Sequence, residues 1–281
     1  MVAILAESSY GKTDVRLIRV SRFPDRHELQ EWSINLQARG NFDEAYIRGD
    51  NRQLLPTDSM RNRIYAMAVG HRGETMELFG IRLLRQFFSE HPQVTQLTIS
   101  FSGAFWEHIE AGGKPHRTAF YKKTGERRIA RVSGTRHEVL IEAGIEGLAV
   151  LKTSDSRFEG FLHDRFTTLT ESGDRILSTE IGAMWSYLSA EIDFDSSWQR
   201  ARLVLLERFA AHQSASLQQT LHFLGSAVLE QNDAIGEISL SLPNRHCLRV
   251  DLSAFGLEND REVFVPVEAP SGLIEARLKR G

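Results

Sequence analysis

The sequence predicts an α+β fold in which paired helices cover one face of an antiparallel sheet. Two observations support this class. Short segments alternate apolar and polar residues as strands do, and longer segments repeat apolar residues at helical spacing. The strands occur in runs around pairs of helices, an order that favours antiparallel pairing over a parallel sheet with single crossover helices.

Three segments carry the strand pattern clearly. Residues 32–38, 96–101 and 237–242 each alternate apolar with polar side chains. Antiparallel sheets with one buried and one solvated face produce this pattern. The residues expected on the buried faces are Trp32, Ile34, Leu36, Ala38, Leu97, Ile99, Phe101, Ile238, Leu240 and Leu242.

Four segments carry helical spacing, and they come in two pairs. Segment 57–69 precedes 75–90 in the first half, and 196–212 precedes 216–230 in the second. Apolar stripes at this spacing most often pack as core against a sheet. The expected core residues are Met76, Phe79, Leu83, Leu84, Phe87 and Phe88, then Trp198, Ala201, Leu205 and Phe209, then Leu217, Leu221, Leu224 and Val228.

The order of elements repeats along the chain. Two strands, two helices and two strands are expected up to about residue 145, and the same order follows to the end. No linker rich in Pro, Gly or Ser separates the halves, so the segment 142–148 is the candidate boundary. We therefore expect two domains, residues 1–145 and 146–281.

Composition excludes several classes of function. The 281 residues include 34 Lys and Arg against 37 Asp and Glu, and this net charge of -3 gives no general reason to bind nucleic acid or an anionic membrane. The single cysteine, Cys247, excludes an intrachain disulfide and fits a reducing compartment. No apolar run approaches the roughly 20 residues that span a bilayer, and no basic segment precedes the apolar start. We expect a cytoplasmic protein.

The common cofactor fingerprints are absent from the sequence. It contains no G-x-G-x-x-G after a strand, no phosphate-binding G-x-x-x-x-G-K-[ST], no G-x-S-x-G and no H-E-x-x-H. The ten histidines show no spacing typical of a metal site. We therefore expect neither a metal nor another cofactor.

Polar residues at two helix starts suggest a site for an anion. Thr57 and Asp58 begin one predicted helix, and Gln218 lies in the first turn of another, where unpaired backbone N–H groups favour negative charge. Phe158 could cover a flat heterocycle, while Arg175 and Gln218 could hold its edge. Each of these residues also has an ordinary explanation, as a helix cap, a packing residue or a surface side chain.

The stretch "SLPNRHCLRV", residues 241–250, raises a similar choice. Asn244 and His246 share one face of an extended segment, and Arg245 with Cys247 would point away from it. Pro243 is expected to end the regular strand. The shared face is therefore either part of a site or a frayed strand end.

Six segments together resemble the urate oxidase (uricase) family in order and spacing. The similarity runs from about Tyr10 to about Leu278. It implies two tandem tunnelling-fold units, whose sheets close into a barrel-like tunnel in a homotetramer with active sites at subunit interfaces. The segments are "YGKTDVRL", "PTDSMRN", "GKPHRTAF", "GLAVLKTSDSRFEGFLHDRFTTLTESGDRILST", "SASLQQTL" and "SLPNRHCLRVDL".

The resemblance implies oxidation of urate by O2 to 5-hydroxyisourate and hydrogen peroxide, without metal or organic cofactor. Phe158 would stack on the purine, Arg175 and Gln218 would clamp its pyrimidine edge, and Leu217, where the family commonly has valine, would offer its backbone N–H. Thr57 and Asp58 would come from a neighbouring subunit. By the same resemblance, Lys12, Thr57 and His246 would form a proton relay, and Asn244 with Thr57 would mark the oxygen site.

Two other functions stay open at this point. The first is a different tunnelling-fold enzyme acting on a purine or pterin, although a zinc-dependent cyclohydrolase would be awkward with one cysteine. The second is a purine-binding protein without turnover. Such a binder would need only the clamp, whereas Lys12, Thr57, Asn244 and His246 are all present.

Overall fold

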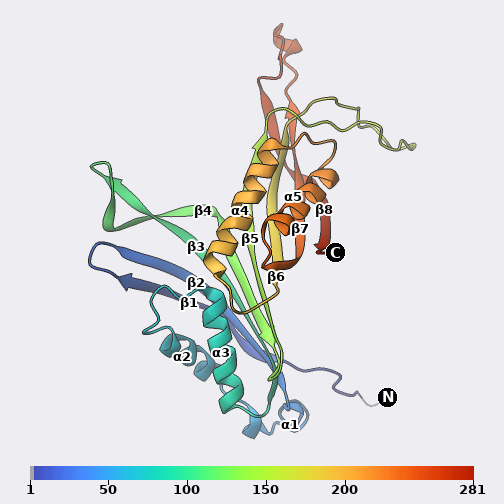
Figure 1. The fold of residues 1–281 in the computed structure, drawn as a ribbon. Helices are drawn as coiled ribbons and strands as arrows, with labels where there is room; N and C mark the ends of the chain where they lie inside the picture. The colour runs from blue at the N-terminus through green and yellow to red at the C-terminus, as the bar shows by residue number, and fades with distance from the viewer. Residues whose placement is uncertain (1–2) are drawn as a thin grey trace. The chain divides into compact units, whose positions relative to one another are not determined.

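The computed structural model describes residues 3–281; their longer elements follow the predicted order, and α1 and two short 3-10 helices are additional to it (Figure 1). The chain divides into two compact units, one reaching Gly144 and including Ser189–Asp195, the other comprising Ile145–Leu188 and Ser196–Gly281. The candidate boundary at 142–148 lies within a strand. The assignment of 1–145 and 146–281 as tandem domains stays a prediction.

The first unit contains four antiparallel strands in the order β1-β2-β3-β4. Helices α2 and α3 lie on one face of these strands (Figure 1). The elements are β1 (Tyr10–Arg22), β2 (His27–Gly40), α1 (Asp43–Arg48), η1 (Asn51–Gln53), α2 (Thr57–Met67), α3 (Met76–Glu90), β3 (Val94–Ala111) and β4 (Lys114–Gly134).

The second unit repeats the pattern with strands in the order β5-β6-β7-β8. The pairs β6 with β7 and β7 with β8 are antiparallel, and α5 packs on β7 and β8. The elements are β5 (Val139–Lys152), β6 (Leu177–Tyr187), α4 (Phe194–Ala211), α5 (Leu217–Gln231), β7 (Ile235–Arg249), η2 (Ser253–Phe255) and β8 (Phe264–Lys279), of which β5 and α4 begin in the first unit.

The predicted core residues are buried in both units. All ten predicted strand residues and all fourteen predicted helix residues are at most 5% exposed. Helix α3 approaches its sheet closely because Gly80 has no side chain: a Cβ there would lie 2.7 Å from Val132. The same holds for Gly225 of α5: a Cβ there would lie 3.0 Å from the side chain of Leu240 and 3.0 Å from that of Leu278. Apolar periodicity therefore determined which faces meet.

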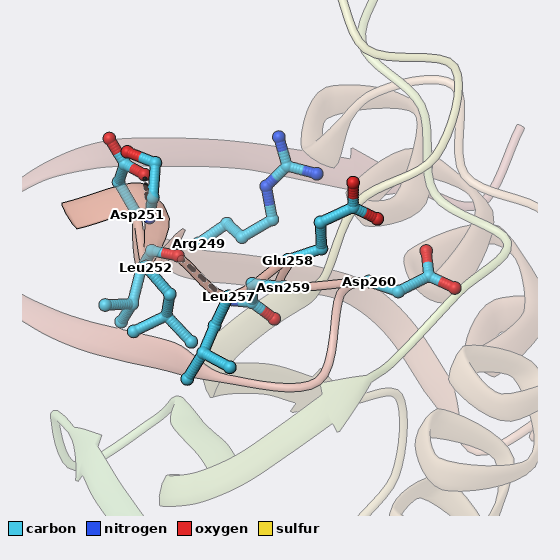
Figure 2. A pocket seen from close by; sticks show the side chains of 9 residues that line it. Arg249, Asp251, Leu252, Leu257, Glu258, Asn259 and Asp260 are labelled. Atoms are coloured by element: carbon cyan, nitrogen blue, oxygen red, sulfur yellow. Dashed lines mark hydrogen bonds between the residues drawn. The ribbon is translucent and has the colours of Figure 1, made fainter. Parts of the chain in front are cut away.

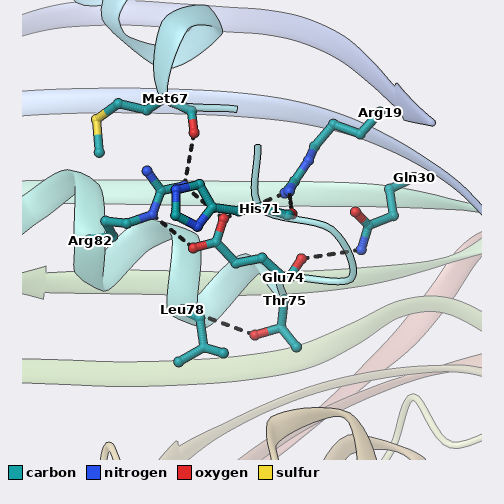
Figure 3. A network of polar contacts seen from close by, with 8 residues as sticks. All are labelled: Arg19, Gln30, Met67, His71, Glu74, Thr75, Leu78 and Arg82. Atoms are coloured by element: carbon teal, nitrogen blue, oxygen red, sulfur yellow. Dashed lines mark hydrogen bonds and ion pairs between the residues drawn. The ribbon is translucent and has the colours of Figure 1, made fainter. Parts of the chain in front are cut away.

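A partly buried charge network holds the connection between α2 and α3 (Figure 3). Arg82 donates to both carboxylate oxygens of Glu74, at 2.9 and 2.7 Å, and to the carbonyl of Met67 at 2.8 Å. Arg19, on β1, lies 3.7 Å from the same carboxylate and donates to the carbonyl of His71. These contacts satisfy the carbonyl of Met67, the last residue of α2, and that of His71 in the connection that follows.

Within residues 3–281, none of the helices combines the length and the apolar character that crossing a membrane would require.

Candidate functional site

The loop at 153–176 positions two of the predicted site residues. Phe158 and Ser172 exchange backbone hydrogen bonds of 2.8 and 3.1 Å, and the N–H of Arg175 donates to the carbonyl of Ser156 at 2.7 Å. These bonds pair the two sides of the loop. Phe158 and Arg175 are therefore held side by side just before β6, although neither lies in a named strand.

The guanidinium of Arg175 lies over the ring of Phe158, and one of its N–H donors is unused. Its guanidinium carbon lies 5.1 Å from the ring centroid. The Nε atom is buried and has no hydrogen-bond partner, and burial lowers the pKa of this arginine below its ordinary value. A buried donor without a partner is costly in a folded protein, so it is the group that an anionic ligand would satisfy.

Phe158 is backed by a stack of rings. The Phe158 and Phe161 rings lie 4.9 Å apart at 14°, and the Phe161 and His163 rings lie 4.8 Å apart at 20°. Offset stacking of this kind fixes the plane of each ring. Phe158 therefore presents a flat apolar surface of set orientation.

The segment before α5 is tied to the same loop. The N–H of Ser214 donates to the carbonyl of Asp155 at 2.9 Å, and the N–H of Arg157 donates to the carbonyl of Ser214 at 2.8 Å. These two bonds place the start of α5 beside Phe158, the residue that follows Arg157.

The first turn of α5 presents the remaining clamp residues. Ser216 caps the helix, with its hydroxyl accepting from the N–H of Gln219 at 3.1 Å. Leu217 is 2% exposed and Gln218 is exposed. The first N–H groups of a helix lack partners within the helix, so this end offers donors as well as an amide. The structure thus brings Phe158, Arg175, Leu217 and Gln218 onto adjoining segments.

Asn244 and His246 lie at the same end of the sheet as Arg175. Asn244 pairs with Thr179 of β6, which begins two residues after Arg175. Both Asn244 and His246 are half-buried, whereas Arg245 between them is exposed. Arg245 forms an ion pair with Glu180. This alternation agrees with the expectation that Arg245 points away from the Asn and His.

The expectation that Pro243 ends the strand is wrong. β7 continues to Arg249, and the irregular register lies between Asn244 and His246, where β8 carries the extra residues. Proline removes one backbone donor from a sheet. Its carbonyl is nevertheless satisfied, because the hydroxyl of Thr179 donates to it at 2.8 Å, and pairing with β8 resumes beyond the irregularity.

In the first unit, one hydrogen bond connects the segments that carry Lys12 and Thr57. The hydroxyl of Tyr10 accepts from the N–H of Leu55 at 2.9 Å, two residues before each of them. Lys12 lies half-buried on β1 opposite Leu36 of β2. The backbone segments that carry Lys12 and Thr57 therefore lie next to each other.

Thr57 is not the cap of its helix. α2 begins at Thr57, Pro56 occupies the cap position, and no side chain caps the helix. The hydroxyl of Thr57 is thus not used for capping. Asp58 is exposed, and its carboxylate contacts Arg61 and accepts from the amide of Asn62 at 3.0 Å. Its side chain is already engaged within α2, while its backbone N–H lies in the first turn.

The uricase family model matches residues 8–133 and 141–275 of the sequence. This chain belongs to the uricase family. The uricase of Arthrobacter globiformis is 41% identical over 277 residues, which cover 99% of this chain and 90% of that protein. The uricase of Dictyostelium discoideum is 32% identical over 282 residues, with 99% and 98% covered.

Solved uricases share the fold. The crystal structure of the Arthrobacter globiformis uricase superposes with a TM-score of 0.93 at 41% identity, covering 100% of this chain and 96% of that one. The crystal structure of a uricase from Bacillus fastidious, at 22% identity, superposes with a TM-score of 0.85. The α+β class with antiparallel sheet and helices is confirmed.

The sequence patterns did not select Tyr10 and Ser156. Ser156 is 1% exposed and its hydroxyl has no hydrogen-bond partner. A serine in a polar loop carries no signal for such burial, and nothing in the sequence links Tyr10 to Leu55. Among residues 3–281, no group of three or more His, Cys, Asp or Glu side chains is arranged to hold a metal ion.

Proposed function

We propose that this chain oxidises urate through a clamp formed by Phe158, Arg175, Leu217 and Gln218. One urate, one O2 and one water give one 5-hydroxyisourate and one hydrogen peroxide, and no metal or organic cofactor takes part. The observation that carries the proposal is the buried, unpartnered Nε of Arg175 beside the ring of Phe158, in a member of the uricase family.

Each clamp residue suits one part of a planar purine anion. The Phe158 ring stacks on its face. Arg175 donates a bidentate pair of hydrogen bonds to its pyrimidine edge, and Gln218 supplies a donor and an acceptor at the same edge. The backbone N–H of Leu217 adds a donor from the start of α5. The family's usual valine and this leucine share that donor, so the change affects pocket shape alone.

Lys12, Thr57 and His246 form the proposed proton relay. Triplet O2 reacts slowly with closed-shell organic molecules, so the substrate must first become electron-rich. Removal of a second proton from urate achieves this, and a lysine with hydroxyl and imidazole partners can carry the proton away. Arg175 stabilises the resulting dianion. Asn244 and Thr57 bind O2, and later peroxide or water, above the ring.

The relay also accounts for the products. The electron-rich purine transfers an electron to O2, the two radicals combine into a hydroperoxide, and peroxide leaves. Water then adds to the oxidised ring. A mere binding protein would need the clamp but not Lys12, Thr57, Asn244 and His246, which favours turnover.

The same proposal includes the assembly. Two tandem tunnelling-fold units per chain close into a tunnel in a homotetramer, with active sites at the subunit interfaces. Thr57 and Asp58 come from a neighbouring subunit and bind the imidazole side of urate, Asp58 through its backbone N–H. The division of the site residues between the two units supports this, since Lys12, Thr57 and Asp58 belong to the first and all the others to the second.

Subunit mixing tests the shared site. Neither a Thr57→Val nor an Arg175→Met variant should oxidise urate well alone. Hybrids of the two should regain part of the activity, because some interfaces then receive both native residues. Hybrids that assemble fully and stay inactive would contradict the shared site.

The single cysteine fits a reducing compartment, so we place the enzyme in the cytoplasm. The activity itself is tested by following urate absorbance with the purified chain in air. A steady fall that requires the chain is expected.

A further inference from the structure

We propose that Asp174 is a positioning residue, which together with Arg261 fixes the geometry of the urate clamp. The inference rests on the proposed function, because it concerns the same clamp. Neither residue belongs to the set predicted from the sequence. Their role follows from the contacts that Asp174 makes on both sides of the loop that carries Phe158 and Arg175.

The carboxylate of Asp174 joins the two sides of this loop. It accepts a hydrogen bond from the hydroxyl of Ser154 at 2.8 Å and one from the N–H of Ser156 at 3.4 Å. The backbone carbonyl of Asp174 accepts from the hydroxyl of Ser172 at 3.0 Å. Phe158 follows Ser156 by two residues, and Arg175 follows Asp174 directly. The carboxylate thus sets the register between the segments that carry the ring and the guanidinium.

Arg261 holds Asp174 from a second element. Its guanidinium donates to the carboxylate of Asp174 at 2.8 Å and to the carbonyl of the same residue at 3.3 Å. Partial burial alone would raise the pKa of Asp174, but the hydrogen bonds from Ser154, Arg261 and Ser156 outweigh it, and the net pKa lies below its ordinary value. Asp174 is therefore held as a carboxylate at neutral pH.

Asn259 holds the connection between β7 and β8, which also carries Arg261; Figure 2 shows Asn259 and its neighbours in this connection. The side-chain amide of Asn259 donates to the carbonyls of Val250 and Val263, at 2.9 and 2.7 Å, and accepts from the N–H groups of Glu262 and Val263. Arg261 sits within this braced turn at φ 62°. The backbone from which the Arg261 guanidinium extends to Asp174 is therefore held by hydrogen bonds within its own turn.

This arrangement determines what the loss of Asp174 should do. Arg175 and Phe158 would remain, but the two segments that carry them would separate more easily. Small displacements of binding groups reduce the productive geometry strongly. A clamp that binds ground state and transition state alike affects KM more than kcat when it is loosened.

The experiment compares steady-state kinetics of the full chain with those of Asp174→Asn, which removes the charge and keeps the shape. We expect KM for urate to rise about tenfold with kcat changed less than about threefold. Arg261→Gln should have the same effect, Arg261→Lys a smaller one, and the double variant no more than either single, because both act through one contact. Glu258→Gln, at an exposed acid of the β7–β8 connection, is the matched control and should leave KM unchanged.

A purely structural role gives a different result. If Asp174 only stabilised the fold, its loss would lower the fraction of active enzyme, so apparent kcat would fall while KM stayed the same. A KM within twofold of the parent value in both Asp174→Asn and Asp174→Ala would therefore overturn the inference. Amide hydrogen exchange at Ser156 and Arg175 provides a readout without turnover, and should be faster in Asp174→Asn. If the parent chain failed to oxidise urate, the proposed function would fall, while exchange at these amides would still decide the anchoring role: unchanged exchange would refute it.

Discussion

The guanidinium carbon of Arg175 lies 5.1 Å from the centroid of the Phe158 ring, and the buried Nε of this arginine has no hydrogen-bond partner. The two side chains offer complementary interactions, a flat apolar face and a planar set of donors. A flat heterocyclic anion satisfies both at once, whereas an apolar ligand would leave the donor unpaired. This pair therefore defines the chemistry of the candidate site.

Replacement of the guanidinium should weaken the clamp. Arg175→Met removes the charged donors, and we expect kcat/KM for urate to fall by about 10²-fold or more. Arg157→Met, an exposed arginine of the same loop, serves as the control and should behave as the parent chain. Equal kcat/KM in the two variants would remove Arg175 from the clamp.

Replacement of the relay lysine should affect turnover more than binding. Lys12→Met should lower kcat by about 10²-fold to 10⁴-fold, the usual effect of a positioned proton-transfer group. Urate affinity, measured without O2, should change little. The control is Lys114→Met at an exposed lysine on β4. A Lys12 variant with the parent's rate would mean that another group moves the proton.

A buried ion pair should contribute to stability. Arg128 donates to both carboxylate oxygens of Glu77 at 3.0 Å, and the side chain of Glu77 is fully buried. Arg128→Met should lower the free energy of unfolding by about 3 to 5 kcal/mol, because it leaves a buried charge unpaired. Urea unfolding measures this, with Arg127→Met at the exposed neighbour as control. Equal losses in the two variants would contradict the expectation.

Acid should remove the contribution of one surface ion pair. The hydrogen bond from Arg63, as the main cause, and that from Gln86, as the second, lower the pKa of Glu90 from 4.5 to about 2. The charged form of Glu90 therefore stabilises the fold fully above the unfolded value of 4.5, and this contribution is lost as pH falls through about 2.

The measurement is the thermal midpoint of Glu90→Gln relative to the parent chain. Their difference should be largest near about pH 6 and should shrink toward about pH 2. Glu258→Gln, at an exposed carboxylate without an ion pair in the described part of the chain, is the control. A difference that stays constant over this range would show that the charge of Glu90 contributes nothing.

The sequence predicted the fold where burial controls the pattern. Trp32, Ile34 and Leu36 alternate because β2 has one buried face, and Phe79 and Leu83 repeat because α3 packs on β3 and β4. Helix α1 was not predicted, since none of its residues is buried and it leaves no periodic signal. The break expected at Pro243 was wrong: β7 continues to Arg249, and the irregular register follows the proline, between Asn244 and His246.

The site was only partly predictable. Residue types and motifs selected Phe158 and Arg175, but the stack behind the ring and the buried Nε depend on the folded loop. Asp174 and Arg261 are 87 residues apart in sequence. No local pattern records a contact at that separation, which explains why their role appears only in the structure.

Urate oxidation is tested most directly by following urate, O2 and hydrogen peroxide together, with the purified chain in the presence of a chelator. Each urate consumed should use one O2 and release one peroxide, at a rate unchanged by the chelator and greatly reduced in Arg175→Met. No loss of urate, or loss that depends on a metal, would contradict this expectation.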